Sequence, residues 1–151
     1  MTDDRPARPG RALGIDLGAR RIGIAVSDSS GTLATPRGTV TRSGDAERDR
    51  RALVDLAVEE EAVVVVVGHP LSLDGTRGTA ARAAEAEVEA LTGPLGARGI
   101  TVELFDERLT TVSAHQALTA GGTRGRDQRA VVDQTAAAIL LSAWLDARRS
   151  R

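Results

Sequence analysis

The stretch "LGIDLGARRIGIAVSD", residues 13–28, decides the fold because it contains two alternating patterns separated by a short glycine turn. Leu13, Ile15 and Leu17 share one face of the first pattern, and alternation of this kind predicts two strands joined as a hairpin. Asp16 lies on the other face of the first strand. The residues expected to share that face are all small: Gly14, Gly23, Ala25 and Ser27. They would leave a shallow floor on which a large ligand reaches the carboxylate, although an acid bonded into a turn would also explain Asp16.

The rest of the chain alternates between helical and extended patterns. Pro36 places a third strand, 33–41, at a sheet edge. Five consecutive valines within 62–68 are typical of a parallel strand that is buried on both faces. Periodicity and turn residues predict the other elements: helices at 44–60, 79–91 (ended by "TGPLG"), 109–122 and 131–147, and a strand at 100–105. The order βββαβαβαα predicts an α/β domain, with a mixed five-stranded sheet of a three-stranded antiparallel meander and two parallel strands, flanked by helices.

The composition excludes several classes of protein. Aromatic residues make up only 1 % of the chain, which argues against a nucleic-acid reader that stacks bases on aromatic side chains. There is no cysteine, and all 20 basic residues are arginine, so disulfides, thiol catalysis and a catalytic lysine are excluded. The net charge of −1 means that any binding of a polyanion must be local.

The length of 151 residues predicts one domain, at 11–148, with a disordered leader at 1–10 and a tail at 149–151. The sequence contains no apolar run of transmembrane length. Its first residues, "MTDDRPARPG", do not resemble a signal peptide, so we expect a cytoplasmic protein.

Two further acidic positions accompany Asp16. The run "DER", residues 106–108, follows the strand at 100–105, and ligands of open α/β sheets gather at such strand ends. A surface pair between Arg108 and Glu107 is an equally good explanation of that run. Asp133 shares a helical face with the apolar side chains of Ala137, Leu140 and Trp144, where a carboxylate needs a partner or a cation. A favourable interaction with the helix dipole explains its place near the helix start, but not its inward-facing side.

If carboxylates from a strand, a strand end and a helix start converge, they form a site for a hard divalent cation, Mg²⁺ or Mn²⁺. Two such ions, about 4 Å apart, can activate water and stabilise the leaving oxygen in phosphodiester cleavage. Arginines in two segments would bind the phosphates of a substrate. These are Arg20 and Arg21, in the turn after Asp16, and Arg124, Arg126 and Arg129, in an expected loop at 121–129.

Four motifs together resemble the YqgF family of bacterial proteins, known as pre-16S rRNA nucleases or Holliday junction resolvases. They are "GIDLGARRIGIAVSD", "VVVGHPLSLDGTRG", "FDERLTT" and "VDQTAAAILLSAWLD", and the match runs from about residue 12 to 146. The resemblance implies a ribonuclease H-like fold and a divalent-metal nuclease that processes the 5′ end of 16S rRNA during ribosome maturation. The acidic positions of the family, catalytic and metal-binding, correspond to Asp16, Glu107 and Asp133.

The motif after the valine strand departs from the family pattern "GLPLNMDG". Here His69, Ser72 and Leu73 replace leucine, asparagine and methionine. Ser72 keeps a hydroxyl for substrate contact but lacks the amide. His69 could be a metal ligand or a general base, and beside Pro70 a structural role is favoured. Asp74 could supply a ligand, although "LDGTRG" is mainly a turn. Ribonuclease H-like resolvases carry an acid at this strand end, and Glu107 on the next strand would replace it.

The resemblance leaves the substrate open between structured pre-rRNA, with ribosomal precursor particles as partners, and branched DNA. A Holliday junction resolvase makes two symmetric nicks and should be a dimer, whereas an RNA nuclease could be a monomer or a homodimer. The hairpin at 13–28 also resembles the phosphate-binding hairpin of actin-like ATPases, but 151 residues without an internal repeat cannot supply the two domains that bind ATP there. A non-catalytic scaffold that binds RNA or ribosomal protein is a further alternative.

Overall fold

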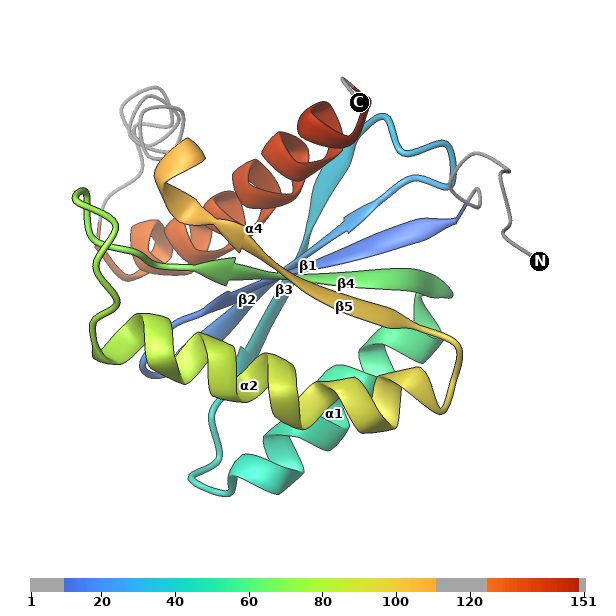
Figure 1. The fold of residues 1–151 in the computed structure, drawn as a ribbon, viewed down its shortest axis with the longest axis horizontal. Coiled ribbons are helices and arrows are strands. Elements are labelled where there is room, and N and C mark those ends of the chain that lie inside the picture. Colours follow the sequence, from blue (N-terminus) through green and yellow to red (C-terminus); the bar gives the residue numbers. More distant parts are fainter. Residues whose placement is uncertain (1–9, 111–124, 150–151) are drawn as a thin grey trace.

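The computed structural model describes residues 10–110 and 125–149, with the side chains of the second range described from residue 136 onward. Strands β1 (Arg11–Leu17) and β2 (Arg21–Ser27) form the expected antiparallel hairpin (Figure 1). Asp16 pairs with Gly23, and Gly14 pairs with Ala25. The prediction that Asp16 shares its face of the hairpin with small residues is therefore confirmed.

The five described strands form one mixed sheet in the order β3-β2-β1-β4-β5. The other strands are β3 (Ala34–Thr41), β4 (Ala62–His69) and β5 (Thr101–Asp106). β3 pairs antiparallel with β2 at one edge, as its proline predicts, whereas β1, β4 and β5 are mutually parallel. The carboxyl ends of these three parallel strands therefore lie along one end of the sheet, where Asp16 and the run 106–108 fall.

The described helices cover opposite faces of the sheet (Figure 1). Helices α1 (Ala46–Glu59) and α2 (Thr79–Gly96) pack on the face that presents Leu13 and Ile15, and helix α4 (Gly125–Arg149) packs on the face of Ala12 and Ala25. The valines of β4 alternate between these two apolar cores, which explains why this strand is hydrophobic on both faces. The predicted α/β class and mixed five-stranded sheet are confirmed.

The predicted end of α2 is wrong. The helix continues through the "TGPLG" segment and includes Pro94, ending at Gly96. Leu91 and Leu95 are both buried on either side of the proline. Because the proline removes only one hydrogen bond near the helix end, burial of these two leucines outweighs the loss.

The last helix also begins earlier than predicted, at Gly125 rather than near residue 131. Residues 126–131 include arginine, glutamine and alanine, which favour a helix, and contain no proline. The expected helix at 109–122 falls almost entirely outside the described residues. What the structure shows there is a short 3₁₀ helix, η1 (Glu107–Leu109), directly after β5. Within the described part of the chain, no helix is long and apolar enough to cross a membrane.

Candidate active site

Asp16 and Glu107 meet at the carboxyl end of the parallel strands. Asp16 is the next-to-last residue of β1, and Glu107 is the first residue after β5. Their carboxyl groups share a hydrogen bond, and neither side chain is fully exposed. Two acids that are 91 positions apart in the sequence numbering are thus brought into direct contact by the sheet.

Gly68, at the end of β4, makes this contact possible because β4 lies between the strands that lead to the two acids. A Cβ atom at Gly68 would lie 2.3 Å from Oε1 and 3.0 Å from Cδ of Glu107. The pairing of Ile15 with Val67 places Asp16 beside Gly68 in the sheet. The Glu107 side chain therefore crosses the bare backbone of β4 to reach β1.

The environment of Glu107 favours its neutral form. Burial of the carboxyl group, with a further contribution from the Asp16 carboxylate beside it, raises the pKa of Glu107 to about 7. The contact with Asp16 is therefore a bond between a carboxylic acid and a carboxylate below that pH. Above it, two negative charges occupy one small volume, which is the situation in which a bound cation is most stabilising.

The third predicted acid, Asp133, lies on α4, but its side chain is outside the described residues. α4 runs antiparallel to β1: a Cβ at Gly14 would lie 3.0 Å from Cβ of Leu141, and Leu145 packs with Ala12. Earlier turns of the helix are therefore directed toward the end of β1 that carries Asp16. Among the described side chains, no group of three histidine, cysteine or acidic residues could hold a metal ion.

Arg108 pairs with Asp106 and not with Glu107. Nη2 and Nε of Arg108 donate to Oδ2 of Asp106 at 2.6 and 2.9 Å. The pKa of Asp106 is lowered chiefly by this contact. The alternative explanation of "DER" as a Glu107–Arg108 pair is therefore wrong, and the arginine leaves Glu107 to face Asp16.

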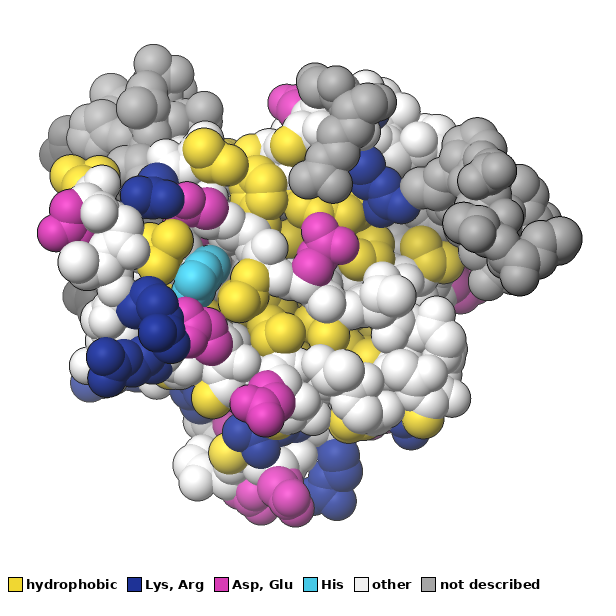
Figure 2. Space-filling model, viewed as in Figure 1, with side chains coloured by type: hydrophobic (Ala, Val, Ile, Leu, Met, Phe, Trp, Pro, Cys, Tyr) yellow, Lys and Arg dark blue, Asp and Glu magenta, His cyan; other side chains and the backbone are white. Residues whose placement is uncertain are grey.

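His69 is bonded away from the two acids. Its Nε2 lies 2.7 Å from Oε2 of Glu85 on α2, and Arg77 donates to both carboxylate oxygens of the same residue. Arg77 and His69 together lower the pKa of Glu85 to about 2. Figure 2 shows charged side chains of both signs around the histidine on this face. The cluster joins the end of β4, the following loop and α2, which is a structural role.

The loop that follows β4 is held by its own polar groups. Asp74 accepts hydrogen bonds from the backbone and hydroxyl of Thr76, which forms the turn expected from the sequence. Ser72 is exposed in this loop, and its backbone nitrogen donates to the carbonyl of Thr76. The substrate contact expected of Ser72 stays a prediction.

The predicted basic residues fall in different environments. Arg20 is exposed in the turn between β1 and β2, beside Arg21. Arg126 and Arg129 belong to the first turns of α4, so their expected place in a loop is wrong, and their side chains are outside the described residues. Arg124 lies outside the described residues altogether.

Two further residues at this end of the sheet, Gly68 and Arg42, were not predicted from the sequence. Gly68 has no side chain to attract attention, although a glycine next to an expected acidic position was a usable signal. Arg42 lies beyond β3, far from Asp16 in the sequence, yet its Nε donates to the carbonyl of Gly18 at 2.7 Å. Nothing in the local pattern of residues 39–44 indicates that contact.

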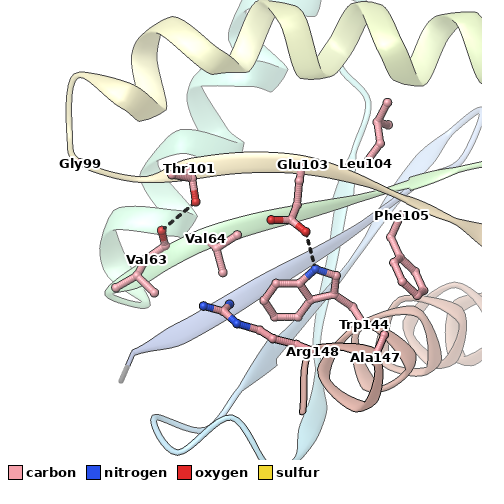
Figure 3. Close-up of a pocket in the computed structure, with 10 residues that line it drawn as sticks. All are labelled: Val63, Val64, Gly99, Thr101, Glu103, Leu104, Phe105, Trp144, Ala147 and Arg148. Carbon is pink, nitrogen blue, oxygen red and sulfur yellow. Dashed lines mark hydrogen bonds between the residues drawn. The ribbon is translucent and has the colours of Figure 1, made fainter. Parts of the chain in front are cut away.

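A separate hollow is lined by residues of β4, β5 and α4, among them Val63 and Thr101 near the amino ends of the two strands. Its volume is about 480 Å³, and Trp144 and Phe105, the only tryptophan and phenylalanine of the chain, both line it. Figure 3 shows the indole nitrogen of Trp144 donating to Glu103, at 2.6 Å, with Arg148 beside the ring. The hollow contains no pair of contacting acids, so we place the candidate site at the Asp16–Glu107 pair instead.

The fold is shared with solved structures of proteins that are less than 25 % identical to this chain. One similar solved structure is RuvC of T. thermophilus in complex with a Holliday junction substrate, with a TM-score of 0.58 and 17 % identity over 93 % of this chain and 96 % of that one. Another is the yeast mitochondrial Holliday junction resolvase Ydc2, with a TM-score of 0.56 and 12 % identity over 97 % of this chain and 83 % of that one.

The chain belongs to the RuvX family, whose model is described as Holliday junction resolvase and matches residues 10–147. A relative from Mycobacterium leprae (strain Br4923) is 50 % identical over 141 residues, covering 93 % of this chain and 75 % of that protein. A relative from Leifsonia xyli subsp. xyli is 48 % identical over 143 residues, covering 95 % and 90 %. Both carry the name "Putative pre-16S rRNA nuclease". The resemblance inferred from the four motifs is confirmed.

Proposed function

We propose that this protein is a metal-dependent endonuclease that hydrolyses phosphodiester bonds of structured nucleic acid, and that its substrate is the 5′ end of pre-16S rRNA in the cytoplasm. The observation that carries the proposal is the contact between the carboxyl groups of Asp16 and Glu107, at the end of the sheet where the parallel strands finish. The names of relatives about 50 % identical support the choice of substrate.

The residues present fit Mg²⁺ or Mn²⁺. Their donors are carboxylate oxygens, which these hard cations prefer. Burial raises the pKa of Glu107 most, and the Asp16 carboxylate beside it raises it further, so a cation between the two groups would offset this repulsion. We assign Asp16, Glu107 and Asp133 as the ligands and catalytic residues. When bound, the ion would supply an activated water and stabilisation of the leaving oxygen.

The protein itself positions the two carboxyl groups. Asp16 is held on a central strand that is paired on both sides, so its carboxylate has little freedom. Glu107 is directed toward Asp16 by the turn of η1, where Asp106 caps the backbone nitrogen of Arg108. Gly14, Ala25 and Ser27, on the same face as Asp16, are buried, and Gly14 allows α4 to pack closely on β1, so the shallow floor expected from these small residues is not open to a substrate. Arg20 and Arg21 follow Asp16 directly in the next turn.

Cleavage of a pre-16S rRNA fragment by the purified protein with Mg²⁺ or Mn²⁺ tests the proposal. The Asp16→Asn variant keeps the shape of the side chain but loses its charge, so we expect cleavage to fall by at least about 100-fold while the circular dichroism spectrum is unchanged. Asp55→Asn is the matched control, because Asp55 is exposed on α1. If Asp16→Asn cleaves as fast as the wild type, the assignment of the site is wrong.

Resolution of four-way DNA junctions is the second candidate, and it is favoured by the description of the family model. The chemistry would be the same, but two symmetric nicks require two sites, so the active form should be a dimer. A synthetic junction assayed beside the RNA, together with sedimentation of the protein in the same buffer, separates the two candidates. Cleavage of the RNA alone by a monomer would exclude the junction.

A further inference from the structure

The arginines near Asp16 and Glu107 divide into two groups according to their partners. On the side of β4, β5 and α2, Arg77 is bound by Glu85 and Arg108 by Asp106. On the side of β2 and β3, Arg20 and Arg42 have no carboxylate within ion-pair distance in the described part of the chain. The positive charge of the first group is already offset, and that of the second is not.

Arg42 is fixed in place by the turn between β1 and β2. Its Nε donates to the carbonyl of Gly18 at 2.7 Å, and its backbone nitrogen donates to the carbonyl of Arg20 at 2.9 Å. The nitrogen of Gly18 closes the turn by donating to Arg21 at 3.0 Å. The turn is tight, because a Cβ at Gly18 would lie 2.3 Å from the Arg21 carbonyl oxygen. Only Nε of the Arg42 guanidinium takes part in these contacts, which leaves its two terminal nitrogens as further donors.

The acids closest in sequence to Arg42 are engaged elsewhere. Asp45 caps helix α1 by accepting from two backbone nitrogens, and Asp49 accepts from the nitrogen and hydroxyl of Ser43. Residues 17–27 and 39–44 contain no aspartate or glutamate at all. These two segments form one corner of the protein and carry Arg20, Arg21 and Arg42 and no acid, so their own net charge is positive, although Asp45 and Asp49 lie close by and the whole chain has a net charge of −1.

The corner is close to the candidate site. Gly18 comes two residues after Asp16, and extended residues advance about 3.3 Å each, so Arg42 lies on the order of 10 Å from the Asp16 carboxylate. That distance corresponds to about three nucleotides of one strand at about 3.4 Å each. A strand cleaved at Asp16 and Glu107 would thus pass within reach of the guanidinium.

We propose that Arg42, together with Arg20, forms a phosphate-binding corner that holds the nucleic-acid strand on the β2–β3 side of the cleavage site. The inference rests on the proposed function, which identifies the ligand as a nucleic acid. It adds the direction in which the nucleic-acid strand leaves the cleavage site. A guanidinium whose Nε is already held by a backbone carbonyl is preorganised to present its remaining donors to phosphate oxygens. On the opposite side, Arg77 and Arg108 are already paired with Glu85 and Asp106, so they have fewer donors left for phosphate oxygens.

Binding measured as a function of salt tests the corner. Fluorescence anisotropy in EDTA, which prevents cleavage, would be recorded with two labelled probes, a pre-16S rRNA fragment and a four-way DNA junction. Each lost phosphate contact reduces the slope of log K against log salt by about 0.7 to 0.9. We therefore expect the slope to fall by nearly one in Arg42→Gln and in Arg20→Gln, and affinity to fall several-fold at low salt.

Arg98→Gln is the matched control, because the Arg98 guanidinium also donates to a backbone carbonyl, that of Pro94, but lies after α2 at the far end of the sheet. Its slope should equal that of the wild type. Arg42→Gln could weaken binding by loosening the turn, whereas Arg20→Gln removes no side-chain contact that holds the turn. A reduced slope in Arg20→Gln therefore reports a lost phosphate contact and not local unfolding. A reduced slope with either probe supports the corner and names the nucleic acid that occupies it.

If the wild type binds either probe and the slope of log K against log salt is unchanged in both Arg42→Gln and Arg20→Gln, the proposal of a phosphate-binding corner is wrong. The absence of wild-type binding to both probes overturns it as well. Neither result decides the cleavage assay with Asp16→Asn, so failure of the corner and failure of the nuclease proposal are distinguishable.

Discussion

At the scale of single residues, the candidate site depends on an amino acid without a side chain. Glu107 can approach Asp16 only because Gly68 leaves the surface of β4 bare between them. The end of β4 itself carries Gly68 and no acid, and the acid that lies over it comes from the next element. The location of the Glu107 carboxyl group is therefore set by the fold and could not be read from its position in the sequence.

The Gly68→Ala variant tests this dependence. The added methyl would fall 2.3 Å from Oε1 of Glu107, so the carboxyl group must move away from Asp16. Because that atom is the far end of a flexible side chain, we expect the melting temperature to change little, and cleavage to fall by about 10- to 100-fold. Gly78→Ala is the control, since no atom lies within 4 Å of its added Cβ. Equal cleavage by the two variants would contradict the role of Gly68.

At the scale of elements, the sequence predicted what depends on local periodicity. The hairpin of β1 and β2, the edge position of β3 and the buried valine strand β4 all follow from alternation, proline and hydrophobicity, and the structure confirms each. The predicted C-terminal end of α2 was wrong because burial of Leu95 outweighs the local signal for a loop. The predicted start of α4 was wrong because the residues after Gly125 favour a helix. Tertiary packing decides such ends.

The candidate site was predictable only in part for the same reason. Asp16 could be identified from its small neighbours within one hairpin. Its contact with Glu107 depends on the order of strands in the sheet, and the contact of Arg42 with Gly18 depends on where β3 ends. Such contacts join segments far apart in the sequence, so no local pattern contains them.

The packing of α4 against β1 gives a prediction at this scale. In Gly14→Ala the new methyl would lie 3.0 Å from Cβ of Leu141 and 3.3 Å from the carbonyl oxygen of Ala137, both rigidly attached to the helix. We expect the helix to shift and the free energy of unfolding in urea to fall by about 1–3 kcal/mol. Gly96→Ala, at the end of α2 with no atom within 4 Å, should be neutral or stabilising by up to about 1 kcal/mol. A neutral Gly14→Ala variant would show that α4 does not pack this closely.

At the scale of the whole molecule, the acid pair links stability to protons and to cations. Among the described groups with a resolved shift, Glu107 has its pKa raised to about 7, whereas the pKa values of Asp28 and Glu85 are lowered to about 2. Between about pH 4.5 and 7 the folded protein therefore binds a proton at Glu107 that the unfolded chain has released. The contribution of Glu107 to stability falls as the pH rises through this range, because the folded state binds more protons at this group.

Thermal unfolding in EDTA measures this linkage. Glu107→Gln keeps a neutral side chain at every pH, so we expect it to exceed the wild type in stability at pH 8 by about 1–2 kcal/mol, with partial exposure of the carboxyl group allowed for. The difference should shrink toward zero near pH 5, where Glu107 of the wild type is protonated. Addition of Mn²⁺ at pH 8 should reverse the order, because a cation bound between carboxylates stabilises only the wild type. If Glu107→Gln is no more stable than the wild type at pH 8 in EDTA, the two carboxyl groups do not repel each other in solution, and the case for a cation between them is lost.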